Sequence, residues 1–358
     1  MKKTIKTLFS LALLTAVSNV ALADDCCSGP VRSYAPYSLM GTHLHQEGEY
    51  MFGYMYMYGE MSQPLVQAAP ADDHHHMMGA SAASDRHDDM DEHEMPIAMP
   101  TPAPASKHQH TMQHSMHMIE GMYGVTDDFN LMGVVPIVSQ EMNHNLGGET
   151  FKTVNSGIGD ISLTALHSLY RADNRLLHGG LGMSFPTADI NDTDVYHGKE
   201  SRHPYMMQIG SGTYDLLPSL TYQAAHKRFG WGMQAISTIR LGTNNNSYAL
   251  GDKYDIHSWV GYEMTQGLQL TTRLSGRFQT DASGRDEGFL LMTSAMGDPS
   301  KQAYALLEGG VGFSYAFQAK ALRGNSAGIE VSFPISQNVD AGWMNQDWAL
   351  TAGWRLSF

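Results

Sequence analysis

The C-terminal segment constrains the fold of this chain more than any other part of its sequence. From Asp347 to the end, apolar side chains occupy every second position, and the last of them is Phe358, the final residue. A repeat of two residues is the pattern of a β-strand with one apolar and one polar face. The chain is therefore expected to end on an amphipathic strand.

A second segment repeats this pattern and adds charge to the polar face. Leu268, Leu270, Leu274 and Phe278 alternate with two arginines and two glutamines. Apolar residues facing outward and charged residues facing inward are typical of a membrane barrel with a wet lumen. A soluble antiparallel sheet with one solvated face is the alternative. We favour the barrel because a terminal aromatic residue resembles the signal by which outer-membrane proteins are recognised, so Phe358 is expected to engage the barrel assembly machinery.

Similar segments recur along the whole chain. They number about twelve, an even count as in bacterial single-chain barrels, so we expect an all-β fold, an antiparallel transmembrane β-barrel. Short turns alternate with long loops, which places both termini in the periplasm and the first loop outside. The expected strands lie near 48–61, 117–125, 130–139, 158–170, 176–186, 213–225, 230–242, 253–264, 268–279, 303–316, 326–334 and 346–358.

The N-terminus carries an export signal. Three lysines within the first six residues precede an apolar run and the small-residue pattern Ala21-Leu22-Ala23, as in a cleaved secretory signal peptide. We expect a signal peptide at 1–23, a periplasmic segment or plug at 24–46, and a barrel at 47–358 with an outer loop at 63–113. The expected location is the outer membrane of a Gram-negative bacterium, in contact with its lipid.

Net charge and motif content exclude several function classes. A formal net charge of −14 argues against a nucleic-acid partner, which needs a basic surface. An outer-membrane lipase needs serine and histidine side by side on one strand face, and neither His167 nor His257 has a serine two residues away. We therefore expect no enzyme activity and no required cofactor.

The outer loop is rich in histidine, methionine, acidic residues and proline, a composition that disfavours a packed core. Imidazole suits Cu(II), zinc or nickel, whereas thioether suits Cu(I), so the mixture favours copper over zinc or nickel. A tolerant low-complexity loop without a metal role is the alternative. The candidate ligands are His74, His75, His76, Met77, Met78, His87, His93, His108, His110, Met112, His114, Met116 and His117.

The first two strands suggest a second candidate site, because tyrosine or phenylalanine alternates with methionine from Tyr50 to Tyr58. If the aromatic face contacts lipid, the methionines point into the lumen. They form either a low-affinity track for Cu(I) or simple packing against a plug that contains His43 and His45. The candidate track consists of Met51, Met55, Met57, Met118, Glu120 and Met122.

Charged residues on the inward faces predict an ion-pair network that fills a narrow lumen. Its expected members are Arg240, Arg273, Arg277 and Arg355 with Glu120, Asp160, Glu263 and Glu330.

Four blocks in order along the chain carry a resemblance to a known family: MGTHLHQEGEYMFGYMYMYGEM, MHMIEGMYGVTDDFNLMGVVPIVSQEMNH, GIGDISLTALHSLY and HPYMMQIGSGTYDL. They resemble the outer-membrane transporter family named after the meta-pathway of phenol degradation. The resemblance implies an outer-membrane barrel that acts as a transporter or channel, without a defined substrate. Three functions follow as hypotheses: a transporter whose loop binds copper, a passive pore for small aromatic or apolar solutes, and a surface protein that only sequesters metal.

Overall fold

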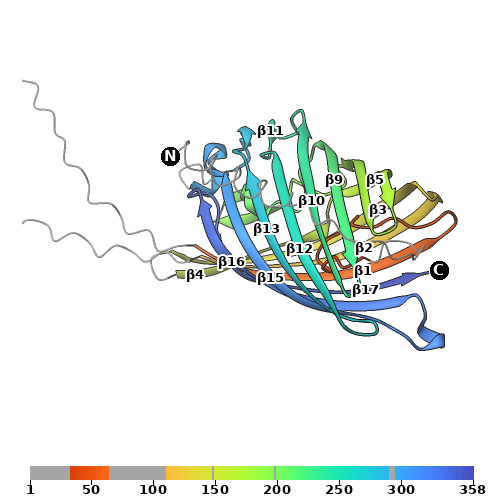
Figure 1. Cartoon of the computed structure of the whole chain (residues 1–358). Coiled ribbons are helices and arrows are strands. Elements are labelled where there is room, and N and C mark those ends of the chain that lie inside the picture. The colour runs from red at the N-terminus through yellow and green to blue at the C-terminus, as the bar shows by residue number, and fades with distance from the viewer. Residues whose placement is uncertain (1–32, 64–109, 147–148, 197–198, 290–294) are drawn as a thin grey trace, which may run out of the picture.

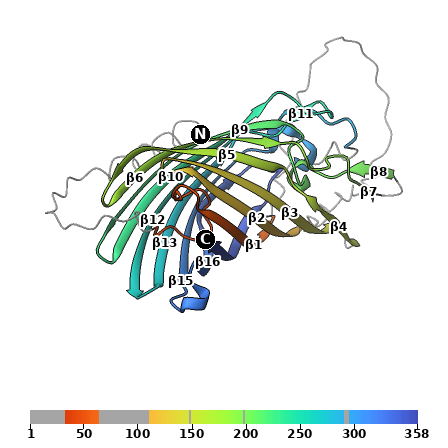
Figure 2. The ribbon, with the colours of Figure 1, turned by 90° about the vertical axis from the view of Figure 1, so that its right-hand side faces the viewer.

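The computed structural model describes residues 33–63, 110–146, 149–196, 199–289 and 295–358. Tilted antiparallel strands form the wall of a barrel (Figures 1 and 2). The wall strands are β1 (Tyr50–Ser62), β2 (Thr111–Thr126), β3 (Phe129–Leu146), β4 (Glu149–Ile158), β5 (Ile161–Ala172), β6 (Arg175–Phe185), β9 (Tyr214–His226), β10 (Phe229–Leu241), β12 (Lys253–Thr265), β13 (Leu268–Gln279), β15 (Tyr304–Ala316), β16 (Asn325–Val339) and β17 (Asn345–Ser357).

The sheet closes on itself. β1 pairs with β2 on one side and with the last strand, β17, on the other, and β2 pairs in turn with β3. β4 and β5 follow one another along the same partner, β3, and count as one strand, so the barrel has twelve strands. The predicted fold class is confirmed.

The outer part of β3 and the whole of β4 were missing from the predicted strands. β3 runs to Leu146 instead of residue 139, and the strand expected at 158–170 begins with β4 at Glu149. Polar residues occupy most positions from Gln140 to Ser156. These strand ends therefore lack the alternation on which the prediction depended, as expected for strand extending beyond an apolar band.

In the rest of the wall, apolar and polar residues alternate along each strand, and this alternation determines which side chains face outward. Apolar residues such as Phe52, Leu181 and Val311 are exposed on the outer surface of the wall. Aromatic residues occupy both rims of that surface. Tyr50, Tyr123, Phe129, Tyr262 and Phe358 lie near the strand ends joined by short turns, and Tyr58, Phe185, Tyr214, Tyr254 and Trp348 lie near the opposite ends.

The predicted short turns are present after β2, β5, β9 and β12, and they define the short-turn end of the barrel. The connection from β15 to β16 at this end contains η4 (Lys320–Leu322). No helix among the described residues is long and apolar enough to cross a membrane. Connections at the opposite, long-loop end contain β7 (Thr193–Tyr196), β8 (Lys199–Arg202), η1 (Tyr205–Met207), β11 (Tyr248–Ala249), β14 (Ser283–Gly284), η2 (Ala295–Gly297) and η3 (Pro299–Lys301).

Residues 33–49 lie inside the barrel at its short-turn end and are called the plug here. The plug contacts strands on all sides of the lumen. Ser38 donates to Glu330 on β16, the carbonyl of Gly41 accepts from His178 on β6, and Asn130 on β3 donates to the carbonyl of His45. One short segment can contact such distant strands only from within the barrel.

Candidate functional site

The register of β1 and β2 brings methionines together along the lumen. Every second residue of β1 faces inward, and the inward residues of β2 lie directly opposite them. The four methionine pairs, called the methionine ladder here, are Met51–Met122, Met55–Met118, Met57–Met116 and Met61–Met112. Tyr54, Tyr56 and their neighbours occupy the outer face of the same strands.

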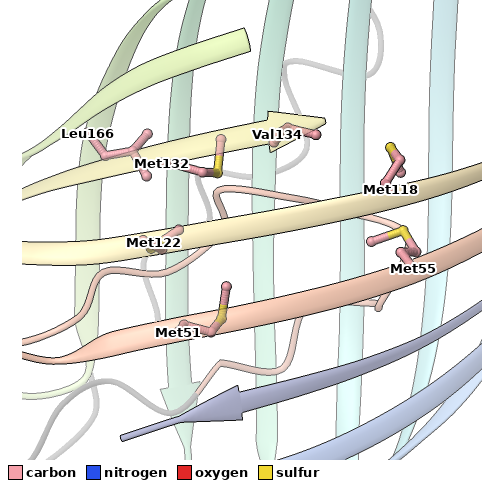
Figure 3. Close-up of a cluster of buried hydrophobic side chains, with 7 residues drawn as sticks. All are labelled: Met51, Met55, Met118, Met122, Met132, Val134 and Leu166. Carbon is pink, nitrogen blue, oxygen red and sulfur yellow. The ribbon is translucent and has the colours of Figure 1, made fainter. Parts of the chain in front are cut away.

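The inner part of this ladder is fully enclosed. Met51, Met55, Met118 and Met122 are between 3% and 7% exposed and pack in one cluster with Met132 and Val134 of β3 and Leu166 of β5. This cluster is called the inner methionine cluster here. Figure 3 shows Met55 beside Met118, and Met51 beside Met122, on neighbouring strands. Met57 and Met116 are half-buried against the cluster, as are Met40 and Leu44 of the plug. The thioethers therefore meet the plug directly.

One carboxylate lies within this row of sulfur atoms. Glu120 is inward-facing on β2, between Met118 and Met122, and is 3% exposed. Its Oε2 lies 3.9 Å from Nε of Arg355 on β17. The backbone N–H of Gly41 also donates toward this carboxyl group, whose Oε1 is buried without a well-formed hydrogen bond to a described residue. Gly53 on β1 lies opposite Glu120. Glu120 therefore supplies the side chain between the pairs Met51–Met122 and Met55–Met118.

A second methionine cluster lies at the long-loop end. Its buried members come from β2, β3, η1, η2 and the connection between β16 and β17. Asn155 of β4 donates to the carbonyl of Met207 at 2.8 Å, and Gln302 donates to the carbonyl of Met296 at 3.3 Å, which fixes the loop backbones. This outer methionine cluster consists of Met112, Met142, Met206, Met207, Met296 and Met344.

Met61 and Met112 connect the two clusters. Met112 belongs to the outer cluster, and Met61 packs against that cluster from the last pair of the ladder. Sequence reasoning missed the outer cluster, because its members are separated by long stretches of chain. The Met206-Met207 pair was visible in the sequence, but its neighbours were not.

Ion pairs, rather than methionines, occupy the opposite wall. Arg273 is 3% exposed and lies 2.9 Å from Glu308 and 2.6 Å from Glu330. Arg277 lies 3.5 Å from Asp255, and Arg240 pairs with Asp215. The lumen thus has a thioether wall on β1–β3 and a charged wall on β9–β16.

The predicted network was right for Arg273 with Glu330 and for Arg355 with Glu120, but it missed partners and included Asp160, which has another role. Asp215 and Glu308 were not predicted, because cross-strand register cannot be read from separate segments. Asp160 instead accepts from Ser211 at 2.9 Å and from the backbone of Ala188. The carboxylate of Glu263 accepts from the backbone N–H of Gly267 at 3.4 Å.

Glycines in the wall accommodate the aromatic rings of the plug. A Cβ at Gly261 would lie 2.8 Å from Cβ of Tyr34, and one at Gly230 would overlap the Tyr34 ring. In the same way, Gly328 and Gly353 make room for Tyr37, whose ring also lies 4.6 Å from the guanidinium carbon of Arg355. The wall therefore has a shape that matches the plug.

A cavity of about 180 Å³ remains beside the plug at the short-turn end. Met51, His43, Tyr37 and Arg355 are among its lining residues. Burial lowers the pKa of His43 well below the ordinary value of 6.5, and the charge of Arg355 adds to this shift. Burial also lowers the pKa of His45, and the carboxylate of Glu49 beside it partly offsets this shift. Both plug histidines are thus neutral near pH 7.

The candidate loop ligands divide into two groups. Eight of them lie outside the described residues: His74, His75, His76, Met77, Met78, His87, His93 and His108. The other five are described. The predicted end of the loop at residue 113 was wrong, because β2 begins at Thr111.

Each of the remaining loop candidates has a defined place. His110 lies just before β2 and contacts the ring of His144 edge to face. Met112, His114 and Met116 face inward, and His114 lies within hydrogen-bond distance of Gln140. His117 faces outward and bonds to the hydroxyl of Tyr54, so it does not join the lumen residues. In the described part of the chain, no three His, Cys, Asp or Glu side chains come together as a metal site.

Comparison with solved structures finds barrels of the same kind. An outer membrane channel from Pseudomonas putida F1 aligns with a TM-score of 0.56 and 10% identity, over 89% of this chain and 99% of that one. A KdgM porin (TM-score 0.38, 9% identity, 70% and 98% coverage) and the CymD monoaromatic hydrocarbon channel (TM-score 0.37, 11% identity, 88% and 89% coverage) align more weakly. The likeness to the Pseudomonas channel shows a shared fold.

No family model and no curated protein sequence matches this chain. The resemblance to the transporter family of the phenol meta-pathway stays a prediction.

Proposed function

We propose that this protein is an outer-membrane channel whose lumen carries small solutes and is narrowed, but not closed, at the periplasmic end by residues 33–49, beside which a cavity remains. The observation that carries the proposal is the division of the wall into an apolar outer face with aromatic rims and an inner face of charges and thioethers. That division is typical of outer-membrane barrels. The solved Pseudomonas relative, which is described as an outer membrane channel, supports it.

The channel proposal is tested by removing the plug. Deletion of residues 33–46 leaves every wall strand intact, because β1 begins at Tyr50. In planar lipid bilayers we expect stable ion conductance from the plug-free barrel and a much lower conductance from the full chain. A plug-free barrel that is folded but never conducts would contradict the proposal.

We further propose that residues 64–109 bind transition metal at the cell surface, copper first. Imidazole and thioether are ligands for both oxidation states of copper. This segment joins the ends of β1 and β2 at Ser62 and Thr111, and both strand ends lie at the long-loop end, as does the outer methionine cluster. Capture there would raise the local metal concentration at the channel entrance. Histidine binds as neutral imidazole, so capture should weaken below about pH 6.5.

The loop proposal is tested by replacing residues 64–109 with a short Gly/Ser turn. This boundary spares β2, which a deletion to residue 113 would shorten. We expect the loop-free strain to change its copper content and copper tolerance, with the barrel still assembled. If it behaves like the wild type, and the loop peptide binds no copper, the metal role is wrong. If it matches a strain lacking the whole protein, the barrel acts only as an anchor for a metal-sequestering loop.

A further inference from the structure

We propose that the methionine ladder and the outer methionine cluster form a pathway for Cu(I), in which thioether sulfur is the main ligand. This rests on the proposed channel function and names the ion that the channel carries. Thioethers are soft donors that select Cu(I).

Composition is the first support. Methionine makes up 25 of 358 residues, yet all six buried members of the outer cluster are methionine, and they come from separate segments of the chain. Leucine or isoleucine would fill similar space with better-defined rotamers, whereas methionine specifies a packed core poorly. Packing alone therefore does not account for sulfur at every one of these positions.

Spacing is the second support. Neighbouring inward residues on one strand lie roughly 7 Å apart, and opposed Cβ atoms on paired strands lie about 5 Å apart. Met55–Met118 and Met57–Met116 are adjacent in this way, and the flexible methionine side chain has three rotatable bonds, so their sulfur atoms can approach the same ion in turn. One inward position separates each of these pairs from the next pair of the ladder, and those two positions hold Glu120 opposite Gly53 and His114 opposite Gly59. From Met61 to Met51 the ladder covers roughly 34 Å of tilted strand, enough to cross an apolar band about 25 Å tall.

Glu120 is the third support, and it separates an ion pathway from an apolar one. Burying a carboxylate that is incompletely paired is unfavourable. Glu120 lies among the thioethers with Arg355 3.9 Å from its Oε2, while its Oε1 has no well-formed hydrogen bond to a described residue. A passing cation would give it a partner, whereas an apolar solute would leave it without one. A soft monovalent cation fits both the sulfur atoms and this carboxylate.

The residues at the two ends of the pathway also support a route for Cu(I). The outer methionine cluster forms its entrance, at the long-loop end of β1 and β2. At the other end Met51 belongs both to the inner cluster and to the lining of the cavity beside the plug. Thioethers therefore connect the long-loop end to the exit near the periplasmic rim.

The test uses the full chain in proteoliposomes with Ag(I) as the probe, since Ag(I) has the charge and soft-ligand preference of Cu(I) without its redox chemistry. Four ladder residues are changed together: Met51→Leu, Met55→Leu, Met118→Leu and Met122→Leu. Such swaps nearly preserve volume and are among the best-tolerated changes in a packed core. The matched control is Met183→Leu with Met264→Leu, because both side chains are exposed.

We expect Ag(I) uptake by the ladder variant to fall about tenfold or more, the scale on which losing a supporting group weakens a metal site. Uptake by the control should match the wild type. Silver-edge X-ray absorption should show sulfur neighbours that decrease in the ladder variant. If the four changes together impair assembly, the pair Met55→Leu and Met118→Leu is measured in the same way, and a smaller loss of uptake is expected.

Other outcomes would overturn the proposal. Uptake of Ag(I) that is unchanged in a folded ladder variant excludes the thioethers as ligands. An equal fall in the uptake of toluene and of Ag(I) would show that the changes disturb the lumen as a whole, because leucine is as apolar as methionine, and that sulfur does not set the pathway. If the plug-free barrel conducts potassium but the full chain carries no Ag(I), the Cu(I) pathway is wrong while the channel proposal stands; if neither is seen, both fail.

Discussion

At the residue scale, the contact between wall glycines and plug tyrosines is the most exacting feature of the lumen. Gly230→Ala would place a methyl group in the ring of Tyr34, and overpacking of this kind costs about 1–3 kcal/mol. We expect the plug to be displaced while the barrel stays folded. Bilayer conductance should rise toward that of the plug-free barrel.

Gly121→Ala is the matched control for this change, since a Cβ there meets nothing within 4 Å. Equal conductance of the two alanine variants would show that the glycine contacts do not hold the plug.

The charged wall supports a second prediction at this scale. Glu330→Gln leaves the buried Arg273 with one of its two carboxylates and also weakens the bond from Ser38 of the plug. Breaking a buried ion pair costs about 3–5 kcal/mol of stability. Because Glu308 still pairs with Arg273, we expect a loss of stability near the lower end of that range. The free energy of unfolding in detergent micelles, from guanidinium titration, measures the change.

Glu141→Gln is the control for the charged wall, because the exposed pair of Glu141 with Lys152 is worth about 0–1 kcal/mol. If Glu330→Gln lowers the free energy of unfolding no more than Glu141→Gln does, the buried network does not stabilise the barrel.

At the scale of elements, the faces of β1 and β2 were predictable, whereas the outer methionine cluster was not. Tyr54 and Met55 fall on opposite faces of any strand that follows the period-two pattern, so the inward methionines could be read from the sequence. Met206, Met296 and Met344 lie in loops or short 3₁₀ helices, where no repeat applies. Their convergence depends on loop paths that residue periodicity does not encode.

The plug is an element whose docking should depend on pH. The pKa values of His43 and His45 are lowered in the docked plug, whereas an undocked plug has histidines of ordinary pKa near 6.5. Below that pH the undocked plug takes up protons that the docked plug does not, so acid weakens docking. The full chain should therefore conduct more as pH falls from about 7.5 to about 5.

The histidine double variant His43→Gln with His45→Gln should conduct equally at both pH values. The control His167→Gln, in an outward-facing residue of β5, should keep the pH response. A response that survives in the double variant would assign it to other groups.

At the scale of the whole molecule, closure of the barrel joins the first and last wall strands. The backbones of Tyr50 and Phe358 exchange two hydrogen bonds of 2.9 Å, and their rings stack with centroids 5.8 Å apart. Removing Phe358 eliminates these bonds together with the proposed recognition signal. We expect less heat-modifiable barrel in the outer membrane, measured by semi-native electrophoresis.

Ser357→Ala keeps the backbone and the terminal ring, and should assemble normally. If loss of Phe358 leaves assembly unchanged, the terminal residue serves neither closure nor recognition.

The twelve-strand architecture could be predicted because lipid on one side and a polar lumen on the other impose the same alternation on every strand between the rims. Beyond the rims lipid no longer imposes this alternation. The strands from Gln140 to Ser156 lie there, and for that reason the sequence did not predict them. The partners of Arg240 and Arg277 were missed for a related reason, since register is a property of two strands and not of one.

The methionine ladder also has a consequence for the lifetime of the protein under oxidative stress. Peroxide and hypochlorite convert thioether to sulfoxide, a polar group that no longer acts as a soft donor, and methionine sulfoxide reductases reverse this. Residues near the entrance, such as Met61 and Met116, are less buried than Met118 or Met122. Oxidant should therefore reach Met61 and Met116 before the buried methionines of the inner and outer clusters, in an order that peptide mass spectrometry can follow, and the activity of the barrel should depend on repair.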